Sequence, residues 1–287
     1  MKLKMLLLIV LLLLVLVLVP VNDAVFEWIG LDSTLFAEVL DFRVNTDLGS
    51  AFQAYSNIAS DADGNFIVTW YDNRYTDYDI FGQRFLYDGT RVGSNFRIND
   101  DSDSDEQYYP RVTTDEAGRF VVVWQDYRVT GYPMNSDIFS QRYNPNGTKA
   151  GVNYIVNDDG ANVSQRAEDI DCDDFGNYVV VFSDLRDGVY NIYCQRYHYS
   201  GTPLGGNVMV NSDCCSNPHH SPRVAVDADG DFVVVWYDQR FGNDDIFFQK
   251  FNSSGEIQGT NTRVNSPSDA AKQVFPDVSC DMFRNFV

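Results

Sequence analysis

Short apolar runs separated by glycine-containing turns make up most of this chain. Phe232 to Trp236 is a continuous β-branched and aromatic run, and Pro222 to Val226 before it alternates apolar and polar positions. Such short runs, bounded by turn residues, predict strands, and a continuous run predicts a strand covered on both faces. No stretch keeps the three-and-four spacing of an amphipathic helix. The pattern therefore predicts an all-β fold.

This strand pattern repeats along the chain. Turn glycines recur at spacings of 54, 58 and 54 residues, at Gly64, Gly118, Gly176 and Gly230. An aromatic anchor keeps the same intervals at Trp70, Trp124, Phe182 and Trp236. Each copy holds four short strands, and a four-stranded sheet that is apolar on both faces must stack on its copies to bury itself. Blades of about 54 residues predict a β-propeller.

The repeats also divide the chain. We expect a signal peptide over 1–24, a linker over 25–40 and a β-propeller over 41–287. Four full copies and a partial fifth are predicted at approximately 52–105, 106–163, 164–217, 218–271 and 272–287. Residues 41–45 match the end of a fourth strand, which predicts a ring-closing strand. The unfinished fifth copy indicates a fragment of a longer protein, although Arg284 in place of the turn glycine leaves a genuine ending open.

The first residues carry the pattern of an export signal. Lys2 and Lys4 precede an apolar run from Met5 to Val19, and Ala24 is a small residue suited to a cleavage site. The run is shorter than the roughly 20 residues that span a bilayer. Asn22, where a second small residue is expected, leaves a retained anchor open as the alternative. We expect a secreted or cell-surface protein, extracellular or periplasmic, with no membrane span once the signal is removed.

Composition excludes several classes. The chain has 287 residues and a net charge of −20, from 41 acidic and 21 basic side chains. Nucleic acid is not an expected partner, because phosphate binding needs clustered Lys and Arg. A content of 44% apolar and 14% aromatic residues excludes a disordered tail. The five cysteines form no disulfide framework, and the equivalent positions of Cys172 and Cys280 suggest buried apolar residues instead.

Residues present in every copy are expected to serve the fold. An Asp-x-Arg pair ends the second strand of each copy, close to the aromatic anchor. These structural residues are Asp72 and Arg74, Asp126 and Arg128, Asp184 and Arg186, Asp238 and Arg240, together with Trp70, Trp124 and Trp236. We interpret the pairs as ion-paired hairpin ends partnered by Asp79, Asp137 and Asp245. Four copies of a catalytic pair would have no mechanistic use.

Two of the turns gather carboxylates that suit a hard cation. They hold Asp61 and Asp63 in the first copy, and Asp227 and Asp229 in the fourth. The complete calcium-loop pattern is absent, and Asp-Gly is also an ordinary hairpin turn. We therefore expect no cofactor, with calcium at these turns as the alternative.

Residues that differ between copies lie mostly in the connections at one end of the sheets, which we call the loop face. They comprise an acidic and tyrosine-rich stretch, an insertion and a histidine pair. The candidate ligand-binding residues are Asp103, Asp105, Glu106, Tyr108, Tyr132, His219 and His220. Cys215 and His219, four residues apart, also raise a soft-metal site, with a variable surface loop as the alternative.

The recurring motifs Asp-x-Asp-Gly-x-Phe-Val-Val-Val-Trp, Gln-Arg-Phe and Arg-Val-Asn resemble those of secreted bacterial β-propeller repeat proteins. The resemblance covers roughly residues 41 to 287 and implies an exported or surface-attached protein without a defined activity. The architecture is similar to that of sialidases. However, the Asp61, Gly64 and Trp70 spacing is wider than in the sialidase motif, and no non-repeated arginine set is evident for a sialic acid carboxylate.

Two function classes follow. The first is an exported binding protein that recognises carbohydrate, protein or a cation-bearing surface on the loop face, without catalytic residues and in an oligomeric state that the sequence does not fix. The alternative is a glycoside hydrolase or sialidase-like enzyme that uses loop-face carboxylates. An enzyme requires a pocket with two non-repeated carboxylates about 5–10 Å apart. A binding module has shallow pockets and no strongly perturbed acid.

Overall fold

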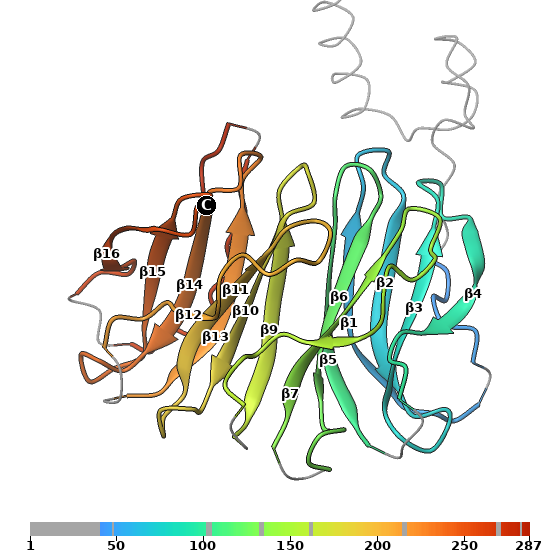
Figure 1. Cartoon of the computed structure of the whole chain (residues 1–287), viewed down its shortest axis with the longest axis horizontal. Helices are drawn as coiled ribbons and strands as arrows, with labels where there is room; N and C mark the ends of the chain where they lie inside the picture. The colour runs from blue at the N-terminus through green and yellow to red at the C-terminus, as the bar shows by residue number, and fades with distance from the viewer. Residues whose placement is uncertain are drawn as a thin grey trace, which may run out of the picture. The chain divides into compact units, whose positions relative to one another are not determined.

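Four antiparallel sheets, each of four strands, build the fold in the computed structural model (Figure 1). The structure describes residues 41–47, 49–101, 105–131, 135–160, 163–213, 217–267, 271–281 and 283–287. The predicted signal peptide and linker lie outside these residues and stay predictions. Within the described ranges, no helix is long and apolar enough to cross a membrane.

Each sheet uses one sequence repeat and pairs its strands in chain order. The first contains β1 (Gln53–Ser60), β2 (Phe66–Asp72), β3 (Asp79–Phe85) and β4 (Arg91–Arg97). The second contains β5 (Gln107–Thr114), β6 (Phe120–Asp126), β7 (Asp137–Tyr143) and β8 (Tyr154–Ile155). The third contains β9 (Gln165–Cys172), β10 (Tyr178–Asp184), β11 (Asn191–Tyr197) and β12 (Val208–Met209). The fourth contains β13 (His219–Val226), β14 (Phe232–Asp238), β15 (Asp245–Phe251) and β16 (Ile257–Arg263). The predicted all-β fold of repeated four-stranded sheets is confirmed.

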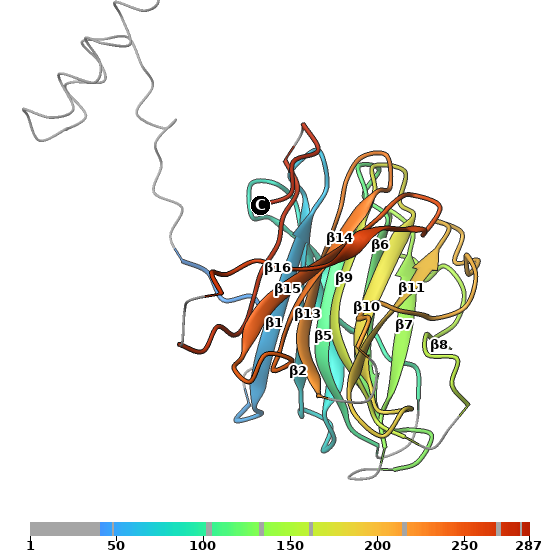
Figure 2. The same ribbon diagram turned by 90° about the vertical axis from the view of Figure 1, so that its left-hand side faces the viewer.

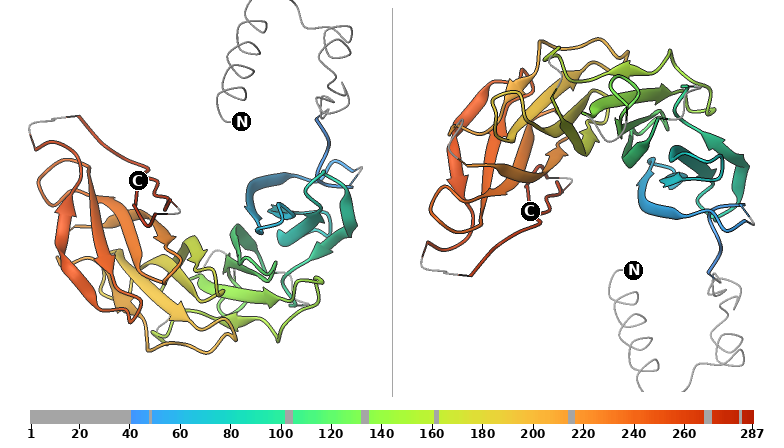
Figure 3. Two further views of the ribbon diagram at one scale, coloured as in Figure 1. Left: turned by 90° about the horizontal axis from the view of Figure 1, so that it is seen from above. Right: turned by 90° about the horizontal axis from the view of Figure 1, so that it is seen from below.

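The sheets stack face to face along an arc, as the two end-on views of Figure 3 show. The first strand of each sheet contacts the first strand of the next, in the order β1, β5, β9 and β13. These four strands line the inner side of the arc, and all four are labelled in Figure 2, where they overlap in projection. Side chains on them can therefore act together although they are more than 50 residues apart in sequence.

Apolar layers between neighbouring sheets form the core. Ile67 and Ile80 of the first sheet pack against Val122 and Trp124 of the second. The strands β6 and β10 are buried along their whole length, as their unbroken apolar runs predict. Each fully buried large side chain of this kind contributes about 1.5–3 kcal/mol through the hydrophobic effect.

The hairpin turn between the first and second strands has an aspartate cap. The Oδ1 atom of Asp61 accepts hydrogen bonds from the backbone N–H of Asp63, at 3.0 Å, and of Asn65, at 2.9 Å. The same cap recurs in the partial fifth copy, where Asp281 binds two backbone N–H groups. Arg284 takes the glycine position there with φ +67, so the turn keeps its left-handed geometry without glycine.

An asparagine on the outer edge of each sheet joins it to the chain segment before it. This side chain accepts a backbone N–H from the connection of the preceding copy, 2.7–2.8 Å away. The four bonds run from Asp100 to Asn153, from Asp158 to Asn207, from Ser212 to Asn261 and from Thr46 to Asn95. The segment around Thr46 thus occupies the place of a preceding copy's connection, while its ring-closing role stays a prediction.

Candidate functional site

A buried aspartate at the end of the second strand of every sheet pairs with the arginine two residues later, and we call this pair with its aromatic neighbours the aspartate–arginine knot. In the second sheet, Asp126 Oδ2 accepts hydrogen bonds from Trp124 Nε1 at 2.7 Å and from Arg128 Nη2 at 2.8 Å. The Arg128 guanidinium lies 4.3 Å from the centre of the Phe139 ring. The ion pair recurs as Arg74–Asp72, Arg186–Asp184 and Arg240–Asp238. These repeated groups are bound to one another and serve the fold.

The prediction that Asp79, Asp137 and Asp245 partner these arginines is wrong. Asp79 pairs instead with Arg97 at 3.3 Å, Asp245 pairs with Arg263 at 2.5 Å, and Asp137 accepts a hydrogen bond from Asn157. The reason is the strand register, which places Asp79 directly opposite Asp72 across the ladder. The arginine of the knot lies two residues after Asp72 and binds that carboxylate, while Asp79 on the facing strand is bound by Asn99 and Arg97 from the far side of its own strand.

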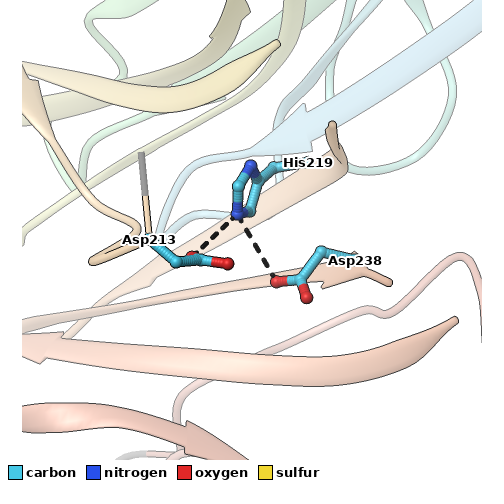
Figure 4. A group of neighbouring side chains, drawn as sticks. All are labelled: Asp213, His219 and Asp238. Carbon is cyan, nitrogen blue, oxygen red and sulfur yellow. Dashed lines mark hydrogen bonds and ion pairs between the residues drawn. The ribbon is translucent and has the colours of Figure 1, made fainter. Parts of the chain in front are cut away.

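His219 lies between Asp213 and Asp238, as Figure 4 shows. Its Nε2 atom is 3.0 Å from Asp213 Oδ1 and 3.6 Å from Asp238 Oδ2. The other three inner strands carry glutamine at this position, and Gln107 donates to Asp101 at 2.9 Å in the same way. Arg240 Nη2 already bridges both carboxylates of the fourth sheet, at 2.9 and 2.7 Å. We assign this cluster to the repeated network of the fold and not to a metal site.

The predicted loop-face residues lie in different environments. Asp103 and Tyr132 are outside the described residues, as is Cys215, while Asp105 lies in the connection before β5. Glu106 accepts the backbone N–H of Tyr78 at 2.9 Å, so it fixes the connection between two sheets. His219 is fully buried. Tyr108 and His220 lie on the inner strands β5 and β13, where His220 packs on Tyr237.

The predicted calcium residues lie at the turns on the opposite end of the sheets. Asp61 and Asp227 each use a carboxylate oxygen to cap their own turn. The Asp229 carboxylate pairs with Arg284 of the partial fifth copy. Asp63 lies in the first of these turns and is exposed. Calcium binding at these turns stays a prediction.

The inner strand of the third sheet carries carboxylates that the other inner strands lack. Glu168 takes the place of Ser56, Pro110 and Pro222 in the other copies. The register of β9 shifts between Ala167, which pairs with Phe182, and Asp169, which pairs with Val181. Glu168 is therefore the extra residue of a β-bulge, which redirects its side chain. The first strands of the other three sheets shift register at the same place, so the bulge belongs to the repeat and only the glutamate is particular to β9.

Two neighbours of Glu168 join the third sheet to the fourth. Asp169 accepts the backbone N–H of Val224 at 3.1 Å, and Asp171 accepts that of Val226 at 2.8 Å. Burial raises the pKa of Asp169 to about 6 and the pKa of Asp171 to about 7, against the lowering effect of these hydrogen bonds. Both carboxyl groups thus titrate well above the ordinary aspartate range.

Glu168 lies between two arginines from the flanking inner strands. Arg111 Nε donates to the Glu168 backbone carbonyl at 2.8 Å, and Arg223 Nη1 donates to the same carbonyl at 3.2 Å. Arg223 Nη1 is also 3.9 Å from the Glu168 carboxylate, whose side chain is 19% exposed. Burial raises the pKa of Glu168 to about 7, although Arg223, Arg111 and Arg166 all lower it. We call Glu168, Asp169, Asp171, Arg111 and Arg223 the inner-strand cluster.

An aromatic group continues from this cluster along the inner side of the arc. Tyr109 of β5 lies two residues before Arg111, and its ring is 4.7 Å from that of Tyr55 on β1 in an edge-to-face contact. Tyr71 packs beneath both rings, at 5.5 Å from Tyr55 and 6.1 Å from Tyr109. Tyr55 keeps 56% of its surface exposed.

Sequence reasoning missed Glu168, Arg111, Arg223, Tyr109 and Tyr55. The predicted site used residues from the connections between copies, whereas these five residues lie on the first strands, which the repeat pattern assigns to the fold. Alignment of the four first strands would have shown the signal, because a glutamate replaces the proline that two of the copies carry. The bulge that turns Glu168 out of the ladder has no such signal in a single sequence.

Comparison with solved structures assigns the chain to the β-propeller class. It resembles the GH93 α-L-arabinofuranosidase of Fusarium graminearum in complex with arabinobiose, with a TM-score of 0.56, 11% identity and coverage of 79% of this chain and 70% of that chain. The Penicillium chrysogenum α-L-arabinanase complexed with arabinobiose matches with a TM-score of 0.55 and 13% identity, and the match covers 79% of this chain and 71% of that chain. A Dyadobacter fermentans protein of unknown function matches with a TM-score of 0.55 and 9% identity, and the match covers 77% of this chain and 71% of that chain. No protein-family model and no curated protein matches the sequence. The fold is a β-propeller, which the matched arabinanase and arabinofuranosidase structures share.

Proposed function

We propose that the protein binds an oligosaccharide on the inner side of its arc of sheets and hydrolyses a glycosidic bond there. Glu168 carries this proposal, because it is a non-repeated, buried carboxyl group with a pKa of about 7 between two arginines. The fold neighbours that bind arabinobiose support a carbohydrate ligand. This proposal favours the hydrolase alternative over a binding protein without catalysis, and it moves the site from the loop face to the inner strands.

Glu168 is suited to the role of general acid. A carboxyl group with a pKa near the working pH is partly protonated and gives up its proton readily, which maximises general acid catalysis. Protonation of the glycosidic oxygen by Glu168 leaves a carboxylate. Arg111 and Arg223 then stabilise the new negative charge, because both lie against this residue before the reaction begins.

Glycoside hydrolysis also needs a second carboxylate, to attack the sugar or to activate water. Asp169 is the candidate, because it follows Glu168 across the bulge and one of its oxygens is held by the Val224 N–H. Burial raises the pKa of both carboxyl groups above the ordinary range, to about 6 for Asp169 and about 7 for Glu168, so both exchange protons close to neutral pH.

A hydrolase screen tests the proposal. Wild-type protein is incubated with arabino-oligosaccharides and with a panel of other neutral oligosaccharides, and new reducing ends are measured. We expect cleavage whose kcat/KM falls above about pH 7, as Glu168 loses its proton. Glu168→Gln, which keeps the shape and removes the acid, should reduce kcat by roughly 10²–10⁴-fold.

Glu116→Gln is the matched control, because Glu116 is an exposed turn residue at the other end of the sheets. It should leave the rate unchanged. Equal rates for Glu168→Gln and wild type would reject Glu168 as the acid. Glycan binding without cleavage by the wild type would return the protein to the class of binding propellers.

A further inference from the structure

We infer that Tyr109 and Tyr55 form a stacking subsite for uncharged sugar rings beside the inner-strand cluster, so that the ligand is an oligosaccharide running from β9 across β5 to β1. The position of bond cleavage in this inference rests on the proposed function. The stacking itself does not, because it needs no catalytic step.

The two tyrosines continue the inner-strand cluster on adjacent strands. β5 contacts β9 on one side and β1 on the other, so Tyr109 lies between Glu168 and Tyr55 in the order of the strands. Arg111, two residues after Tyr109, donates directly to the Glu168 backbone. Glu168 and Arg166 both act on the titration of Tyr109, which places its hydroxyl group within their electrostatic range. A chain bound at Glu168 therefore reaches Tyr109 first and Tyr55 next.

The backbone turns both side chains out of the ladder. Tyr55 has φ +53 and Tyr109 has φ +54, values that are unusual for a bulky residue. Ser221 has φ +50 at the equivalent place in the fourth sheet, so the bend itself belongs to the repeat. The bend carries a tyrosine in the first two full copies, and it carries Phe275 in the partial fifth copy, with φ +58 and a ring contact to Tyr237 at 6.0 Å. What distinguishes the first two copies is that two aromatic bends lie on adjacent strands, next to the inner-strand cluster.

The surroundings suit a sugar ring. Tyr71 supports both rings from beneath, which fixes their orientation and leaves Tyr55 exposed. A hollow of 230 Å³ opens beside Tyr55 and is lined by Gln53, Ser56 and Trp70, among others. Amide and hydroxyl groups next to aromatic and apolar side chains match a ligand with apolar C–H faces and hydroxyl groups at its edge.

Charge selects the kind of sugar. The tyrosines carry no positive charge, and the protein has a net charge of −20, which repels polyanions at a distance. Arg111 and Arg223 lie on the Glu168 backbone, and Arg166 lies within electrostatic range of Tyr109. We therefore expect a neutral unit, and not a uronic acid, to stack on Tyr55, which is farther from these arginines in the order of the strands.

Binding measurements on the Glu168→Gln protein test the subsite without interference from cleavage. Arabino-oligosaccharides of increasing length are titrated by calorimetry into this protein and into its Tyr55→Ala and Tyr109→Ala derivatives. Affinity for the longer chains should fall roughly 3–10-fold in each derivative, as expected for loss of one aromatic contact. Binding of the disaccharide should change less, because it cannot reach from Glu168 to both rings. Tyr109→Phe, which keeps the ring, should bind like the parent protein.

Tyr87→Ala is the matched control, because Tyr87 is 75% exposed on a turn away from the inner strands. It should leave every affinity unchanged. Equal affinities for the parent and both tyrosine derivatives at all lengths would overturn the inference, as would preferential binding of oligogalacturonates. If wild type cleaves and Glu168→Gln does not, while the tyrosine derivatives bind normally, the proposed function survives and this inference fails. If the tyrosine derivatives bind the longer chains more weakly and wild type cleaves nothing, the stacking subsite survives and the proposed hydrolase function fails.

Discussion

Removal of the carboxylate of Asp126 is expected to destabilise the protein more than removal of its counterpart Asp184. Asp126 is fully buried and accepts hydrogen bonds from the Trp124 indole and from both the backbone and the side chain of Arg128. Among the described residues, Asp184 accepts bonds from the backbone and from Nη2 of Arg186, because Phe182 replaces the tryptophan in the third sheet. The two sites therefore differ by one buried indole N–H and by one arginine bond, since Arg128 Nε also donates to Asp126 at 3.0 Å.

The magnitudes follow from these contacts. Breaking a buried ion pair by removing one partner costs about 3–5 kcal/mol. In both sheets the arginine keeps a second aspartate at 2.9 Å, Asp100 for Arg128 and Asp158 for Arg186. A third aspartate lies at 3.2 Å from Arg128 and at 4.0 Å from Arg186, so neither arginine is left without a carboxylate. Asp126→Ala also leaves the indole N–H without an acceptor, which adds about 1–3 kcal/mol. We expect Asp126→Ala to cost more than Asp184→Ala by this amount.

Urea unfolding followed by circular dichroism measures both costs. The slope of the unfolding free energy against urea concentration should be the same in all variants, which shows that the unfolded state is unchanged. Trp124→Phe provides the internal control, because it removes the indole donor and leaves the arginine bonds to Asp126 in place. In that background, the cost of Asp126→Ala should fall by about 1–3 kcal/mol, and the two single variants with the double variant form a double-mutant cycle. Equal costs of Asp126→Ala and Asp184→Ala in the wild-type background would refute the role given to the indole hydrogen bond.

Two further predictions concern the buried titratable groups. Burial raises the folded-state pKa of Asp171 to about 7, so its protonated form stabilises the fold below the unfolded pKa and this contribution is lost as the pH rises through about 7. Asp171→Asn, which keeps an acceptor for the Val226 N–H, should raise the unfolding free energy at pH 8 by about 1–3 kcal/mol and change it little at pH 4, measured by urea midpoints; an identical pH slope in both proteins would contradict this. His219→Gln restores the residue of the other inner strands and should change the unfolding free energy by less than about 1 kcal/mol, whereas His219→Ala should cost about 1–3 kcal/mol. A thermal shift of His219→Gln as large as that of His219→Ala would show that the histidine does more than replace a glutamine.

The repeated part of this structure was predictable from sequence, because each strand is bounded by a turn with its own signal. The run from Phe232 to Trp236 became β14, and the glycine spacing located all four sheets. The aspartate–arginine knot was also predictable, since its two members lie two residues apart. The predicted partner of Asp79 was wrong, because the spacing of residues within one strand does not determine which residues face each other across two strands. The inner-strand cluster was missed because the identity of the innermost strand, and the bulge at Glu168, depend on how the sheets stack.

The hydrogen bonds between neighbouring inner strands differ in number from one pair of sheets to the next. Asn57 links β1 to β5 through an amide contact with the Val112 N–H. Asp169 and Asp171 link β9 to β13 through two carboxylate contacts with the N–H groups of Val224 and Val226. Two contacts spaced two residues apart fix both the distance and the alignment of two strands, whereas one contact leaves a pivot. The third and fourth sheets are therefore held in register by polar bonds as well as by the apolar layer between them.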